Sequence, residues 1–150
     1  MRDDVDDRSL MFMALKEAQE AAVKGEVPVG AVIVMGDLIL SGHNRVIMDA
    51  DPTAHAEVVV LRQASRVTGN YRLLDACLYV TLEPCIMCVG AIIHARIRRL
   101  VYGAADPRYG AVESLLKGFE LGLNHRPEVV SGLFEDDAAR LLKTFFQERR

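Results

Sequence analysis

Helix-type patterns alternate with short β-branched runs along this 150-residue chain, and this alternation restricts its possible folds more than any other feature. The first helical pattern covers residues 9–25, where apolar side chains recur at helical spacing and Gly25 follows the last turn. The runs VGAVIVM and LILSGHNR, separated by the turn signal Gly36-Asp37, then predict a β-hairpin over residues 29–45. A helix followed by a hairpin is therefore expected at the start of the chain.

The same alternation continues to the last residue. The predicted elements are a helix at residues 54–67, a strand at 77–82, a helix from 84, strands at 98–104 and 128–131, and a helix at 135–150. Because short, mostly buried strands alternate with helices, we expect an α/β fold with helices on both faces of one sheet. Residues 9–150 are predicted to form a single domain, and the acidic residues 1–8 to be disordered.

Composition indicates a globular protein of the reducing cytoplasm. The chain is 51% apolar and 26% charged, and its length suits one domain. No apolar run suggests a signal peptide or approaches the roughly 18 residues that cross a membrane. Three cysteines, an odd number, disfavour a disulfide framework. The net charge of −3 does not favour nucleic-acid binding, although four arginines within residues 96–108 could form a local basic surface.

Two cysteines stand three residues apart in the sequence TLEPCIMC, directly after the strand predicted at residues 77–82. A C-x-x-C pair between a strand and a helix is typical of thioredoxin-like redox motifs, where the helix mouth lowers the thiol pKa. It is equally typical of one half of a zinc site, either structural or catalytic. The two cysteines alone leave these possibilities open.

The sequence TAHAE, at the start of the second predicted helix, favours a metal site. His55 and Glu57 are two residues apart, and at a helix mouth both side chains can turn toward the same end. The helix carries the chain roughly 21 Å away from His55. The next strand brings it back by roughly 23 Å. We therefore expect the N-termini of two helices to face each other, with His55 opposite Cys85 and Cys88.

One imidazole and two thiolates are ligands that zinc prefers. Cys77 lies roughly 16 Å upstream of Leu82 along the strand, too far to supply a fourth ligand, and is interpreted as a buried thiol. Glu57 could close the coordination sphere, but a carboxylate beside a three-ligand zinc is more useful as a proton carrier. The fourth position is then left to water.

These residues suit hydrolytic deamination of a nucleobase. Zinc lowers the pKa of a bound water to about 7. Glu57 can take a proton from that water and return it to a ring nitrogen and then to the departing amine. A metalloprotease would normally contain H-E-x-x-H, which this sequence lacks.

The paired motifs H-x-E and P-C-x-x-C form the signature of zinc-dependent nucleobase deaminases. Over about residues 9–148 the chain also resembles the bacterial tRNA-specific adenosine deaminases, in the stretches VPVGAV, DPTAHAE, LRQ, NYRL, LYVTLEPCIMC, GAIIHARI and NHR. The resemblance implies a three-layer αβα, cytidine-deaminase-like fold with a five-stranded mixed sheet, and a zinc deaminase domain over residues 9–150. It also implies a homodimer that binds one zinc ion per subunit.

The implied reaction converts adenosine to inosine at the wobble position of an arginine tRNA with the anticodon ACG. The implied partner is the tRNA anticodon stem-loop, because unstacked loop bases are accessible to a deaminase. The arginines of residues 96–108 could neutralise some of its phosphates.

The resemblance further implies roles for individual residues. His55, Cys85 and Cys88 match zinc ligands, and Glu57 matches the proton shuttle. Substrate-binding positions are matched by Asn44 (target nucleoside), Val29 and Ala56 (walls of the base pocket), and Asp106, Arg108, Asn124, His125 and Arg126 (anticodon-loop nucleotides). Local structure alone could also account for three of them: Asn44 could end a hairpin, Asp106 could form a turn, and Asn124 could be a plain loop residue.

Two other functions stay open at the level of sequence. One is a zinc deaminase of a free base or nucleotide, such as cytosine, cytidine, guanine or dCMP, because the sequence does not show the polarity of the pocket. The other is a non-catalytic, zinc-stabilised RNA-binding module.

Overall fold

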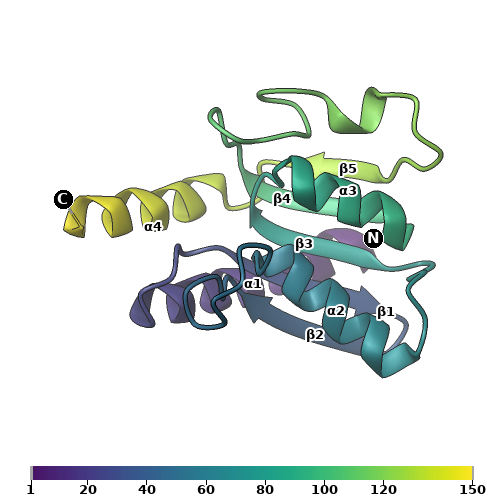
Figure 1. The fold of residues 1–150 in the computed structure, drawn as a ribbon, viewed down its shortest axis with the longest axis horizontal. Coiled ribbons are helices and arrows are strands. Elements are labelled where there is room, and N and C mark those ends of the chain that lie inside the picture. Colours follow the sequence, from purple (N-terminus) through teal and green to yellow (C-terminus); the bar gives the residue numbers. More distant parts are fainter. Residues whose placement is uncertain (1, 150) are drawn as a thin grey trace.

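The computed structural model describes residues 2–149, and these form a five-stranded sheet between two layers of helices (Figure 1). The strands are β1 (Gly30–Met35), β2 (Leu38–His43), β3 (Cys77–Leu82), β4 (Arg99–Ala104) and β5 (Glu128–Ser131). Their order in the sheet is β2-β1-β3-β4-β5. β1 is antiparallel to β2 and β3, whereas β3, β4 and β5 are parallel. The α/β class and the mixed five-stranded sheet are confirmed.

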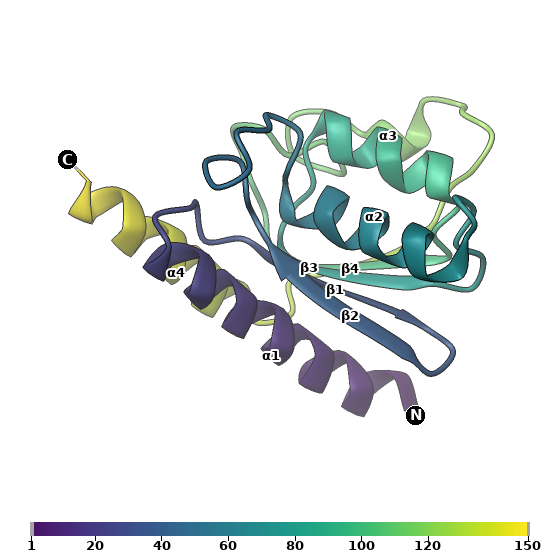
Figure 2. The same ribbon diagram turned by 60° about the horizontal axis from the view of Figure 1, so that its bottom comes forward.

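Within residues 2–149, four α-helices cover the sheet, two on each face. They are α1 (Arg2–Val23), α2 (Ala56–Thr68), α3 (Ile86–Ala95) and α4 (Glu135–Glu148). Figure 2 shows α2 and α3 together on one face, with α1 and α4 on the other. A short 3₁₀ helix, η1 (Gly118–Glu120), lies in the long connection between β4 and β5. Among residues 2–149, no helix combines the length and the hydrophobicity that crossing a membrane requires.

The three central strands are buried on both faces, so they appear in the sequence as continuous apolar runs. Alternate residues serve different cores because strand side chains point to opposite faces in turn. Leu78 and Val80 belong to the core beneath α2 and α3, whereas Cys77 and Tyr79 belong to the core beneath α1. Cys77 is therefore a buried thiol, as expected.

The start of α1 corrects one expectation. Residues 1–8 were expected to be disordered, yet α1 begins at Arg2 and the Asp7 side chain is buried. Two guanidinium nitrogens of Arg99 donate to the Asp7 carboxylate at 2.7 Å each, and the Tyr79 hydroxyl donates to it at 2.6 Å. The expectation is wrong at Asp7 and Arg8, because the cation that pairs with the acidic segment lies 92 residues away. Met1 lies outside the described residues.

A glycine allows α1 to pack directly on β1. A Cβ on Gly30 would lie 1.9 Å from the Ala14 carbonyl oxygen of α1. The Gly30 amide also donates to the Thr81 hydroxyl at 3.1 Å, which joins the start of β1 to the end of β3. The segment before β1, which includes Val29, is thereby placed at the end of the sheet where β3 finishes.

Candidate metal centre and active site

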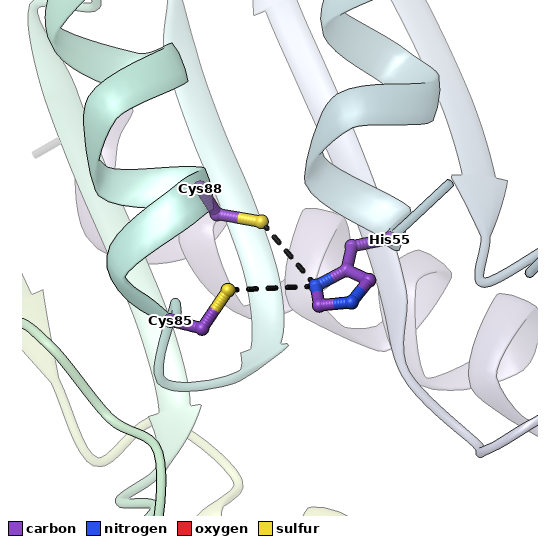
Figure 3. A group of neighbouring side chains, drawn as sticks. All are labelled: His55, Cys85 and Cys88. Atoms are coloured by element: carbon purple, nitrogen blue, oxygen red, sulfur yellow. Dashed lines mark hydrogen bonds between the residues drawn. The ribbon is translucent and has the colours of Figure 1, made fainter. Parts of the chain in front are cut away.

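The N-termini of two helices, α2 and α3, meet where β3 ends. His55 is the N-cap residue of α2 and Cys85 is the N-cap residue of α3, and both have an extended backbone. Within the described chain neither side chain caps its own helix, so each can point into the space between the helices. Cys88 lies on the first turn of α3. Figure 3 shows the three side chains converging from the two helices.

The convergence has the dimensions of a metal site. His55 Nδ1 lies 3.5 Å from Cys85 Sγ and 3.6 Å from Cys88 Sγ. The three donor atoms lie within 4.8 Å of one another. The expectation that His55 faces both cysteines is therefore confirmed. Nδ1, rather than Nε2, is the nitrogen that faces the two sulfur atoms.

The donor set fits zinc in number and in chemistry. One imidazole nitrogen and two sulfurs match a catalytic zinc site that has three protein ligands. The pKa of the Cys85 thiol is lowered to about 4, first by its hydrogen bond with Cys88 and then by His55, against the opposing effect of burial. Since the thiolate is the form that binds metals, this environment prepares Cys85 as a ligand.

Glu57 lies in the first turn of α2 and is only 4% exposed. Burial raises the pKa of its carboxyl group to about 7. The charges of His55 and Cys85 also act on the pKa of this carboxyl group, which places it beside the cluster of three donor residues. A carboxyl group with a pKa near neutrality can both accept and release a proton, as a general acid–base catalyst must.

Asn44, Val29 and Ala56 come together at the same end of the sheet. The Asn44 side-chain oxygen accepts a hydrogen bond from the Ala56 amide at 2.7 Å. The Asn44 amide donates to the Val29 carbonyl at 3.1 Å. All three residues are buried. Asn44 therefore ends the hairpin and also attaches it to the mouth of α2.

The segment after β4 brings Asp106 and Arg108 to the same end. β4 runs parallel to β3, and Leu82 pairs with Ala104 at their ends. The Asp106 carboxylate accepts hydrogen bonds from the amides of Arg108 at 3.1 Å and Tyr109 at 3.2 Å. Asp106 therefore forms a turn, and both Arg108 and Tyr109 are exposed on it.

Asn124, His125 and Arg126 lie at the opposite end of the sheet. They precede β5, whose first residue pairs with the first residue of β4. A ring nitrogen of His125 is 2.7 Å from the carbonyl oxygen of Ile97, in the turn after α3. Within a single chain these three residues therefore lie away from the metal centre. Their contact with nucleotides stays a prediction.

Sequence reasoning missed two buried carboxylates near the site. Glu83, inside TLEPC, is 2% exposed and accepts hydrogen bonds from residues 106–114. Glu26 is 1% exposed and accepts from the amides of Ile47 and Met48. Their signal in the sequence was an acidic residue within an otherwise apolar segment, which is uncommon unless its charge is satisfied.

The fold, together with the cluster of His55, Cys85 and Cys88, is that of the zinc-binding deaminases, the class to which this protein belongs. Residues 4–104 match the model of the cytidine and deoxycytidylate deaminase zinc-binding region. The chain is 48% identical over 147 residues to the tRNA-specific adenosine deaminase of Haemophilus influenzae, a match that covers 96% of this chain and 85% of that protein. It is 51% identical over 142 residues to the tRNA-specific adenosine deaminase of Agrobacterium fabrum, which covers 93% of each.

A solved structure from a study of A-to-I editing by tRNA:A34 deaminases, at the wobble position of transfer RNA, superimposes with a TM-score of 0.86. The two sequences are 48% identical, and the superposition covers 89% of this chain and 99% of that one. The chain belongs to the tRNA-specific adenosine deaminase family, within the cytidine and deoxycytidylate deaminases.

Proposed function

We propose that this protein is a zinc-dependent hydrolase that converts adenosine to inosine at the wobble position of a tRNA anticodon. The observation that carries the proposal is the convergence of His55, Cys85 and Cys88 beside the buried Glu57. The substrate is inferred from the relatives, which are named as tRNA-specific adenosine deaminases. The proposed tRNA is an arginine tRNA with the anticodon ACG, and the proposed location is the cytoplasm, where that tRNA is used.

The proposed ligands of one zinc ion per subunit are His55 Nδ1, Cys85 Sγ and Cys88 Sγ. When bound, zinc acts as a Lewis acid that makes water a nucleophile at neutral pH. Glu57 takes a proton from the attacking water and delivers it to N1 of adenine as the oxygen adds to C6. It then takes the proton of the new hydroxyl on C6 and passes it to the amino group, which leaves as ammonia while the carbonyl of inosine forms.

The neighbouring residues hold the adenine in place. Since the Asn44 side-chain oxygen is already engaged by the Ala56 amide, its NH₂ group is the part that remains to donate to the nucleoside. Val29 supplies an apolar wall, which helps to exclude bulk water from the reacting carbon.

The RNA is proposed to cross the turn that carries Asp106 and Arg108. These residues share the end of the sheet with the metal centre, so nucleotides adjacent to the reacting base can reach them. Asn124, His125 and Arg126 lie at the other end and would meet only nucleotides farther from the reacting base.

The homodimer is also a proposal. Large apolar side chains are exposed on and beside the α2–α3 layer, at Val67, Tyr71, Leu74 and Ile86. In the described chain η1 packs against α3, and no helix lies over the outer side of α2 (Figure 2). Multi-angle light scattering on the zinc-loaded protein tests the proposal, because a monomer at micromolar concentration would contradict it.

The function is tested by incubating the zinc-loaded protein with the arginine tRNA and measuring inosine after digestion. Cytidine, guanine and dCMP are assayed in parallel as free substrates. Inosine at the wobble position supports the proposal. Turnover of a free base or nucleotide without inosine in the tRNA would show instead a deaminase of small substrates. RNA binding without any deamination would indicate the non-catalytic module.

A further inference from the structure

The carboxylate of Glu83 is surrounded by hydrogen-bond donors from one loop. Its Oε1 accepts from the Asp106 amide at 3.0 Å and from the Ser114 hydroxyl at 2.5 Å. Its Oε2 accepts from the amides of Val112 at 3.0 Å, Glu113 at 2.8 Å and Ser114 at 3.0 Å. One buried side chain therefore holds both ends of the segment 106–114, named here the Glu83-bound loop.

The five hydrogen-bond donors around position 83 require a carboxylate as their acceptor. An ionised carboxylate only accepts hydrogen bonds, and its two oxygens together meet all five donors. A glutamine has the same shape, but its NH₂ group would face donors at one of the two oxygen positions. Buried donors left without an acceptor are costly, so the loop could not keep this conformation with glutamine at position 83.

Gly110 shows independently that the loop is built around the carboxylate. A Cβ added to Gly110 would lie 2.3 Å from Glu83 Cδ and 2.6 Å from the Asp106 carbonyl oxygen. The Gly110 amide donates to that same carbonyl at 2.8 Å, and the Ala111 amide donates to the Pro84 carbonyl at 2.8 Å. The loop therefore lies directly against the segment that leads into α3.

The Glu83-bound loop presents polar groups beside the metal centre. Asp106 forms the turn at its start, and Arg108 and Tyr109 are exposed on that turn. Glu83 itself is two residues before Cys85, one of the proposed zinc ligands. The segment 83–85 thus contains both a proposed zinc ligand, Cys85, and the carboxylate that binds the loop with the exposed turn. A loop that is ordered before its ligand arrives avoids an ordering cost on binding.

We propose that Glu83 is a positioning residue for RNA: it holds the Glu83-bound loop in the conformation that presents Asp106 and Arg108 to the anticodon loop. This inference rests on the proposed function, because it takes RNA as the ligand of that turn. Glu83 acts through the loop and does not touch the reacting atoms.

The test uses two variants, Glu83→Gln and Gly110→Ala, in the zinc-loaded full chain. Glu83→Gln removes acceptors from the loop, and Gly110→Ala pushes the loop away from an intact carboxylate. The control is Glu113→Gln, which makes the same change of charge in the same loop. Its side chain can still accept from the Tyr102 hydroxyl, which donates to Glu113 at 3.1 Å.

For deamination of an anticodon stem-loop we expect KM to rise about tenfold or more in both variants, because several donors to a charged group lose their partner. The expected changes in kcat and in zinc content are small, and the control should behave as wild type. An unchanged KM in Glu83→Gln would overturn the proposal. So would a fall in kcat together with loss of zinc, since Glu83 would then support the metal centre and not the RNA contact.

Amide hydrogen exchange separates this inference from the proposed function. In Glu83→Gln the amides of Asp106, Val112, Glu113 and Ser114 should exchange faster, whereas those of β3 should not. If the wild-type protein makes no inosine in tRNA, the proposed function fails, and binding of the same stem-loop by fluorescence anisotropy then decides the inference. Wild-type exchange rates or wild-type RNA affinity in both variants would overturn it.

Discussion

The ion pair between Asp7 and Arg99 should be a main attachment of α1 to the sheet. Both side chains are buried, at 7% and 8% exposure, and the guanidinium binds the carboxylate through two nitrogens. In Asp7→Ala the Arg99 charge would stay buried, with the Cys77 sulfur 3.7 Å from a guanidinium nitrogen and the Glu128 carboxylate, itself 63% exposed, 3.4 Å from Nε. Removing one partner of a buried pair costs about 3–5 kcal/mol.

The Tyr79 hydrogen bond is lost in the same variant. The Tyr79 hydroxyl donates to Asp7 at 2.6 Å and would lose its acceptor, which costs about 1–3 kcal/mol in a buried site. These contributions overlap because they share one carboxylate, so about 3–5 kcal/mol is expected in total. The assay is urea unfolding of the zinc-loaded protein at neutral pH, followed by circular dichroism.

The control is Asp49→Ala, which removes an ion pair of the same chemistry on the surface. Asp49 and Arg45 are 41% and 37% exposed, so the expected loss is below about 1 kcal/mol. If Asp7→Ala lost no more than this control, the buried pair would not hold α1 to the sheet, and the reasoning would be refuted.

The same pair predicts a dependence of stability on pH. Burial alone would raise the pKa of Asp7, but hydrogen bonds from Arg99 and Tyr79 more than offset it and hold that pKa below the ordinary value of an aspartate. A carboxyl group whose pKa is lowered by folding contributes stability above its unfolded pKa and loses it as the pH falls through the folded one. Stability attributable to Asp7 should therefore be complete at neutral pH and decline below about pH 4. An equal decline in Asp7→Ala would contradict this.

Three further predictions concern the metal centre, the chemistry and the packing. His55→Ala should bind less than one equivalent of zinc per chain, measured by inductively coupled plasma mass spectrometry; a full equivalent would mean that the ligand set is wrong. Glu57→Gln should keep zinc and RNA binding but lose about 10²–10⁴-fold in deamination, and wild-type turnover would exclude Glu57 as the proton carrier. Gly30→Ala should lower the melting temperature because its Cβ would overlap Ala14, whereas Gly90→Ala, where a Cβ meets nothing within 4 Å in the described chain, should not; equal melting temperatures would contradict the close packing of α1.

The order and the type of the regular elements could be predicted locally. The strand expected at residues 77–82 is β3 (Cys77–Leu82), because buried strands appear as short β-branched runs between turn signals. The helix expected at residues 54–67 is α2 (Ala56–Thr68), which starts two residues later since His55 keeps an extended backbone.

The metal centre could also be predicted, because its geometry follows from lengths along the chain. The helix after His55 and the strand before Cys85 run in opposite directions over similar distances. They return the chain to its starting level, and the structure places His55 Nδ1 within 3.6 Å of both sulfurs. Helical spacing applies only to Cys88, on the first turn of α3, because Cys85 precedes the helix with an extended backbone.

The sequence by itself thus determined the α/β class and the convergence of His55, Cys85 and Cys88, because each follows from residues close together in the chain or from simple lengths. Only the tertiary structure showed that Asp7 is buried against Arg99, that Glu83 binds a whole loop, and that Asn124 lies far from the metal centre. These features depend on which strands become neighbours in the sheet. That choice is made by packing across the whole core, which brings together residues as distant as Asp7 and Arg99 without leaving a local pattern.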